Sequence, residues 1–188
     1  MKRIITSLLL FVFVFGAGAA VHAQGTEWEA LNDEVGSLYK QGHYDRAVVV
    51  AKKALAVAEE AVGREHPDVA TSLKNLALLY MTQGQYAQAE PLYKRSLAIW
   101  EKALGPEHPD MATSLNNLAL LYTTHGQYAQ AEPLYKRSLA IWEKALGPNH
   151  PDVAQSLENM AALFRKTGRE KEAEVLQKRA AAIRAITR

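Results

Sequence analysis

The chain has 188 residues, of which 48% are hydrophobic, so it can bury a core and is not a wholly disordered protein. It contains no cysteine, which excludes disulfides, thiolate metal sites and cysteine nucleophiles. The formal net charge of +2 is far from the clustered basic excess that nucleic acids and anionic membranes favour, so we expect no nucleic-acid partner.

The first 23 residues have the pattern of a secretory signal peptide. Two basic residues precede an apolar stretch from Ile4 to Phe15, and small residues then lead to Ala23. Cleavage after Ala23 would leave 20 basic and 20 acidic side chains in residues 24–188. We therefore expect an exported bacterial protein, periplasmic or secreted, with no stable membrane insertion after cleavage. The alternative is an uncleaved anchor, because apolar and small residues run to Val21, close to the roughly 20 that span a bilayer.

The rest of the chain repeats with a period of 42 residues. Residues 68–109 and 110–151 differ at only five positions, which indicates duplication. The outer units diverge more, as expected of repeats that have a neighbour on one side only. Residues 24–188 are therefore expected to form one domain of four units, at about 27–67, 68–109, 110–151 and 152–188.

Each unit is expected to form two helices joined by a tight turn. In the third unit, apolar residues at spacings of three and four predict a first helix over about 110–125. Gly126 can adopt the left-handed conformation that closes a helix, so a reversal is expected there. A second helix should begin near Tyr128 and end at the stop signal Leu146-Gly147-Pro148.

Two pairs of residues shape this hairpin. Small side chains at Ala119 and Ala131 should let the two helices approach closely. Pro91 and Pro133 lie about one turn inside the second helices, where a missing backbone donor is expected to cause a slight bend and not a break.

These residues resemble a known family. The large, small and aromatic positions of the third unit are similar to the tetratricopeptide consensus: Leu118, Ala119, Tyr122, Gly126, Tyr128, Ala131, Tyr135 and Ser138. The resemblance covers residues 28–186, and the 42-residue unit looks most like the repeats of kinesin light chains and their bacterial relatives. It implies an all-α, right-handed superhelical solenoid of four antiparallel hairpins, whose first helices line a concave groove that holds a peptide or helix of a partner.

Carried over position by position, the resemblance places twelve residues in that groove. They are Asn32, Asp33, Lys74, Asn75, Thr82, Asn116, Asn117, Thr124, Glu158, Asn159, Arg165 and Lys166. Asparagines at 75, 117 and 159 could hold a peptide backbone, because each amide offers two donors and an acceptor. Basic groove residues could bind carboxylates. The alternative is that the asparagines bond only within the solenoid.

Neither a metal site nor an active site is expected. His66, His108 and His150 sit in separate linkers between repeats, whereas ligands of one zinc ion lie within roughly 2 Å of it. The Pro-Asp pairs that follow are explained by helix starts, with the acid at the positive end of the dipole. No nucleophile elbow, phosphate loop, dinucleotide fingerprint or zinc-protease motif occurs, so we expect no enzyme and no cofactor.

Three function classes remain for a protein of this kind. The first is an adaptor that binds a protein or peptide in its groove. The second is a self-associating scaffold, because a neutral surface and end units that resemble internal ones could let copies stack as a homo-oligomer. The third is an accessory subunit of an envelope enzyme or a secretion complex, tethered to the membrane if residues 1–23 are retained.

Overall fold

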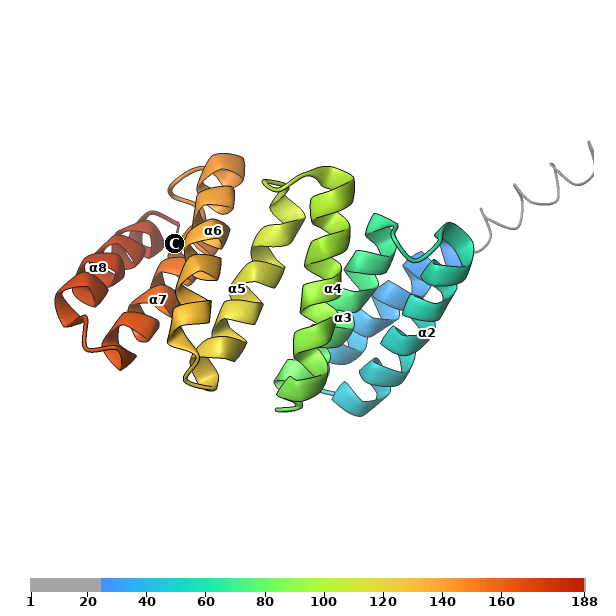
Figure 1. Ribbon diagram of the computed structural model, residues 1–188. Helices are drawn as coiled ribbons and strands as arrows, with labels where there is room; N and C mark the ends of the chain where they lie inside the picture. Colours follow the sequence, from blue (N-terminus) through green and yellow to red (C-terminus); the bar gives the residue numbers. More distant parts are fainter. Residues whose placement is uncertain (1–24, 188) are drawn as a thin grey trace, which may run out of the picture.

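The computed structural model describes residues 25–187, so the predicted signal peptide lies outside the described residues. Within that range the chain is helical, without strands, and folds into an elongated row of hairpins (Figure 1). A first helix over residues 25–40 is followed by α2 (Tyr44–Val62), α3 (Pro67–Thr82), α4 (Tyr86–Leu104), α5 (Pro109–Thr124), α6 (Tyr128–Leu146), α7 (Pro151–Lys166) and α8 (Glu170–Ile186). The expected all-α solenoid of four hairpins is confirmed.

The helices begin and end at the predicted signals. Pro109 is the first residue of α5, and Asp110 lies in its first turn. Gly126 has φ +73° at the turn into α6, and Gly147 has φ +87° where α6 ends, both in the left-handed region that side chains other than glycine avoid. The sequence did not suggest the role of His108: its Nδ1 accepts a hydrogen bond of 3.3 Å from the Asp110 amide and caps the helix.

Small residues bring the two helices of each hairpin together. Ala119 and Ala131 are fully buried, as expected for the close approach of α5 and α6. Where the two helices meet, the buried Ser138 hydroxyl of α6 donates a 2.8 Å hydrogen bond to the Ala112 carbonyl of α5. The hydroxyl therefore has a partner in the core. Pro133 lies in the second turn of α6, and the helix continues through it without a break, as expected.

The row of hairpins curves toward the first helices. Each second helix packs against the first helix of the next hairpin, so α4 lies between α3 and α5 (Figure 1). First helices of neighbouring hairpins also approach each other, α3 to α5 and α5 to α7, whereas α2, α4, α6 and α8 have no such backbone contact with one another. The shorter spacing along the row of first helices makes that side the inner, concave face.

Ion pairs with the same 42-residue spacing connect the second helices on the outer face. The Arg137 guanidinium donates to the Glu101 carboxylate at 2.9 Å and to the Pro106 carbonyl at 2.8 Å, which ties α6 to α4 and to the loop after it. The equivalent ion pairs are Arg95 with Glu59 and Arg179 with Glu143. These partly exposed pairs add little stability individually, but their repetition sets how each hairpin sits on the next.

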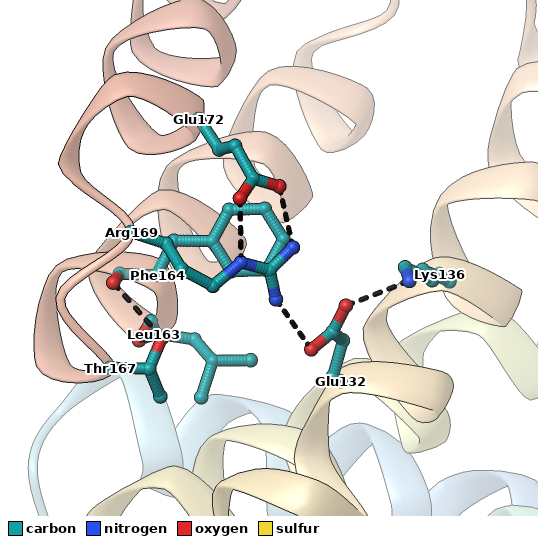
Figure 2. Close-up of polar contacts among 7 residues, drawn as sticks. All are labelled: Glu132, Lys136, Leu163, Phe164, Thr167, Arg169 and Glu172. Atoms are coloured by element: carbon teal, nitrogen blue, oxygen red, sulfur yellow. Dashed lines mark hydrogen bonds and ion pairs between the residues drawn. The ribbon is translucent and has the colours of Figure 1, made fainter.

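At the last junction a second arginine adds to the Arg179–Glu143 pair. Arg169 donates to Glu172 of its own helix and, at 2.7 Å, to Glu132 of α6 (Figure 2). Its guanidinium stacks 3.7 Å from the ring centre of Phe164. Hydrogen bonds from Lys136 and Arg169 hold the pKa of Glu132 below its usual value.

Two residues of this cluster, Phe164 and Arg169, differ from their equivalents one repeat earlier, and the two differences are linked. At the preceding junction, the Tyr122 hydroxyl donates to Glu90 at 3.1 Å. Phe164 occupies the position of Tyr122 one repeat later and lacks the hydroxyl, while Arg169 replaces Gln127. The arginine therefore supplies the hydrogen bond that the phenylalanine cannot make.

Substitution of Ala131 tests the close approach within a hairpin. Ala131→Leu places a bulky side chain in a fully buried position between α5 and α6, and should lower the free energy of unfolding by about 1–3 kcal/mol. Urea denaturation followed by circular dichroism measures the change. The control Ala129→Leu lies in the same helix at an exposed position and should alter stability by less than about 0.5 kcal/mol. Equal losses for both variants would contradict the packing model.

Substitution of Arg169 tests the cluster in Figure 2. A carboxylate whose folded pKa is lowered adds stability above its unfolded pKa, about 4.3, and this contribution is lost as the pH falls through the folded value. Arg169→Gln should therefore be less stable than the unaltered chain at neutral pH, and the two should converge in acid. Urea titrations across this pH range measure the difference. The exposed control Lys171→Gln should show neither effect, and a constant gap for Arg169→Gln would refute the assignment.

Candidate partner-binding face

The inner face consists of four equivalent positions in each first helix. In α5 they are Thr113, Asn117, Leu120 and Thr124, which share one side of the helix because they are spaced by three or four residues. All sixteen inner-face residues are exposed or half-buried. The others are Glu29, Asp33, Gly36 and Lys40; Thr71, Asn75, Leu78 and Thr82; and Gln155, Asn159, Ala162 and Lys166.

Seven of the twelve sequence-predicted residues belong to this face. They are Asp33, Asn75, Thr82, Asn117, Thr124, Asn159 and Lys166. Thr82 and Thr124 are exposed, and each hydroxyl donates a 2.9 Å hydrogen bond to a carbonyl of its own helix, which leaves the hydroxyl able to accept one. Asp33 and Lys166 are exposed and form no ion pair within residues 25–187. Both therefore keep their charges available to a partner.

The other five predicted residues do not belong to the inner-face positions. Asn32, Lys74, Asn116 and Glu158 occupy one equivalent position, immediately before the inner-face asparagine position, and successive helical residues point about 100° apart. Asn116 is only 6% exposed, in contrast to the groove-facing position expected from the resemblance. Arg165 likewise bonds within its hairpin, to Glu170 at 3.3 Å and to Gln177.

Two rungs of the expected asparagine ladder are closed by bonds inside the solenoid. The Asn75 side-chain amide donates to the Asn32 carbonyl oxygen at 2.9 Å, and Asn159 donates to Asn116 at 3.2 Å. The NH2 groups of Asn75 and Asn159 are thus used within the solenoid, as the alternative interpretation of the asparagines expected. The Asn159 carbonyl oxygen also accepts a 3.3 Å hydrogen bond from Gln155, whereas within residues 25–187 the Asn75 carbonyl oxygen accepts none. Recognition of a partner by this ladder stays a prediction.

The central junction differs because Lys74 replaces the amide acceptor. Its ammonium lies 5.8 Å from the ring centre of Trp100, and burial lowers its pKa while Asp110 opposes the change. Asn117 consequently has no asparagine partner across this junction. The Asn117 amide lies beside the buried Tyr93 hydroxyl; burial raises the pKa of Tyr93, and hydrogen bonding to Asn117 opposes the rise. Asn117 therefore adjoins a tyrosine at this junction, whereas Asn75 and Asn159 each bond an asparagine at theirs.

Sequence reasoning missed the apolar part of the face. Leu78 is half-buried and Leu120 is 36% exposed at the same position of adjacent repeats, with Gly36 and Ala162 at the two ends. A hollow of about 190 Å³ lies beside Gly36, between the first helix and α3. Alignment of the four units in their 42-residue frame could have identified this variable position.

The described residues offer neither a metal site nor a membrane-spanning helix. Within residues 25–187, no group of three histidine, aspartate or glutamate side chains is placed to hold a metal ion. None of the helices in that range is both long enough and apolar enough to cross a bilayer. The chemistry that the inner face can perform is therefore hydrogen bonding, ion pairing and apolar contact with a bound chain.

Solved structures of similar shape support this description. BtubC (BKLC) from P. vanneervenii is 28% identical with a TM-score of 0.73; the match covers 81% of this chain and 61% of that one, so this chain spans about three fifths of its length. A putative kinesin light chain with nearly identical TPR-like repeats from Podosopora anserina is 28% identical with a TM-score of 0.68, and the match covers 91% and 84% of the two chains. Aspartyl phosphate phosphatase F from Bacillus subtilis, 18% identical with a TM-score of 0.74, covers 86% and 41% and shares the fold alone.

The family comparison agrees with these structures. No curated protein matches the chain closely. A family model described as tetratricopeptide repeat matches residues 29–95, 73–144 and 125–185, which together include most of the chain. The chain therefore belongs to the tetratricopeptide repeat family, with repeats like those of kinesin light chains.

Proposed function

We propose that this protein is a non-catalytic adaptor that holds an extended segment of a partner protein on its inner face. Tetratricopeptide repeats generally mediate protein interactions and are generally not catalytic, which supports the class. The observation that carries the proposal is the contrast between the two faces. The outer face is connected by the repeated arginine pairs, whereas inner-face groups such as Asn117, Asp33 and Lys166 have bonding capacity that the solenoid does not use.

The geometry of the inner face suits an extended peptide. Its four positions recur in every repeat, so they form rows that run along the solenoid, across the helix axes. Three of the rows carry polar groups that can bond a peptide backbone, and the row that includes Leu78 and Leu120 is apolar and can contact its side chains. The charged residues lie at the two ends, with Glu29, Asp33 and Lys40 in the first repeat and Lys166 in the last.

The alternative of end-to-end stacking has less support, because both ends of the described solenoid are polar. In the first helix, Glu27 and Glu34 stand at positions that are buried and apolar in α3, namely Val69 and Leu76. At the other end, Arg184 of α8 replaces a buried tryptophan and pairs with Glu158 at 3.2 Å. Neither surface offers the apolar contact that joins one repeat to the next.

We further propose that the protein acts outside the cytoplasm, on the strength of the predicted signal peptide. Cleavage after Ala23 would make Gln24 the first residue of the exported form. N-terminal sequencing of the protein recovered from the cell envelope or the medium measures this directly. Retention of Met1 would contradict cleavage and favour the tethered form.

Photocrosslinking in the source cells tests the adaptor function. A photoreactive amino acid at Thr113, an exposed inner-face position, should yield discrete crosslinked partner bands. The same amino acid at Gln88, an exposed position of α4, is the control and should yield few. Addition of Asn117→Arg should abolish the Thr113 bands, because a bulky charge then replaces the central amide. Crosslinks from Gln88 alone would refute the assignment of the binding face.

A further inference from the structure

A hollow on the turn edge of the solenoid is separate from the inner face. It lies between the turn that precedes α2 and the turn that precedes α4, which are neighbours along one edge of the row (Figure 1). Its volume is about 410 Å³, within the roughly 300–1,000 Å³ of small-molecule pockets. We call this hollow the turn pocket. Its lining residues are Gly42, Tyr44, Asp45, Gln83 and Gln85, none of which belongs to the inner face.

The turn pocket owes its chemistry to Asp45, because only the first repeat has an acid at this position. The equivalent residues are Ala87, Ala129 and Lys171. One carboxylate oxygen of Asp45 accepts a 2.7 Å hydrogen bond from the Gln83 side-chain amide, which joins the first hairpin to the second. The other carboxylate oxygen accepts no hydrogen bond from residues 25–187. It is therefore available to a ligand.

The charges near the turn pocket favour a neutral ligand. Lys40, His43 and Arg46 are exposed and lie close to the lining residues in the chain, but within residues 25–187 none of them forms an ion pair with Asp45. The free carboxylate disfavours phosphates and other anions, and the basic neighbours disfavour a cation. A single carboxylate also supplies too few oxygen ligands for a calcium or magnesium ion.

The two glutamines add uncharged donors and acceptors. Within the described part of the chain, the Gln83 carbonyl oxygen accepts no hydrogen bond and the Gln85 side-chain amide has no partner. A carboxamide offers two donors and one acceptor group. Together with the free oxygen of Asp45, these groups suit a ligand with several adjacent hydroxyls, because each hydroxyl can both donate and accept.

Tyr44 forms an aromatic wall of the pocket. Its half-buried ring packs edge to face on Tyr39, with ring centres 5.5 Å apart, so it is held in place before any ligand arrives. At the next turn the equivalent ring, Tyr86, packs against His125 with ring centres 4.9 Å apart. His125 is the equivalent of Gln83, so the second turn carries a ring where the first has an amide beside a hollow.

We propose that the turn pocket binds a neutral saccharide. One face of a sugar ring, formed by C–H groups, packs on the Tyr44 ring, whose apolar surface suits it. Adjacent sugar hydroxyls donate to the free Asp45 oxygen and accept from the Gln85 amide. This site is additional to the proposed adaptor function and does not depend on it.

Nuclear magnetic resonance titration tests the ligand, with the protein purified as the cells process it. The probes are four neutral disaccharides: maltose, cellobiose, lactose and N,N′-diacetylchitobiose. At least one should bind and receive saturation from the protein at its ring C–H protons. Asp45→Ala should weaken this binding at least about tenfold. The substitution introduces the residue that the next two repeats carry, at an exposed position, so the variant should remain folded.

Substitutions of tyrosine test the aromatic wall. Tyr44→Phe keeps the ring and should bind the disaccharide as the unaltered protein does, whereas Tyr44→Leu should weaken binding at least about tenfold. Tyr128→Leu is the matched control, because it changes the equivalent residue of the third repeat, where Ala129 replaces the acid. It should leave binding unchanged. Urea unfolding of the two leucine variants establishes that both are folded.

Sedimentation with insoluble cellulose and chitin distinguishes a polysaccharide from a free sugar. Retention of the unaltered protein, but not of Asp45→Ala, would identify a polysaccharide as the ligand. Binding of a disaccharide alone would identify a free sugar. Either result supports the proposed chemistry.

Three outcomes would overturn the inference, and they are distinguishable from failure of the adaptor function. They are no binding of any disaccharide or polysaccharide, equal binding by Asp45→Ala and the unaltered protein, and equal loss of binding for Tyr44→Leu and Tyr128→Leu. If Asp45→Ala instead removed the Thr113 crosslinks while no saccharide bound, the pocket would belong to the surface that holds the partner segment. Saccharide binding without Thr113 crosslinks would leave the turn pocket and remove the adaptor function.

Discussion

The burial of each second helix against the first helix of the next hairpin is the contact on which the whole structure depends. One hairpin buries only one side of its second helix, so residues such as Trp100 and Trp142 need another hairpin to exclude water. Burying a side chain of this kind contributes about 1.5–3 kcal/mol. In α8, where no further hairpin follows in the described chain, the equivalent residue is Arg184, which is ion-paired and partly exposed. The last helix of the described solenoid therefore presents a polar side chain where the earlier second helices bury a tryptophan.

This packing leaves the inner face free to vary without loss of the fold. The residues that join the repeats point into the junctions, and the inner-face residues point away from them. One inner-face position can therefore be Gly36, Leu78, Leu120 or Ala162 while the helices stay in register. The same freedom at the junction position allows Lys74 to replace an asparagine, which releases Asn117 from the ladder at the centre of the face. Binding specificity in such a protein comes from exchanges of single side chains within a repeated frame.

Charge has a different role on the outer face. The arginine pairs that connect successive second helices lie partly in solvent, so each contributes modestly to the free energy of unfolding. They connect helices whose backbones do not touch and thereby help to set the curvature of the solenoid. At the last junction the Arg179–Glu143 pair is kept, and Arg169 adds a bond to Glu132 that Phe164 cannot donate. A lost hydroxyl and a gained guanidinium are thus two parts of one structural change.

The sequence alone determined the number of units, the helix pairs and their ends, because these depend on local signals that recur every 42 residues. Gly126, Pro109 and the apolar spacing of α5 act through their own backbone and nearest neighbours, which the sequence contains. Only the tertiary structure decided which of two adjacent residues faces a partner. Asn116 and Asn117 have the same chemistry, yet one is buried against the next repeat and the other lies on the inner face. The sequence shows Gly36 where the next two repeats have leucine, but only the packing of the first helix against α3 shows that a hollow lies there.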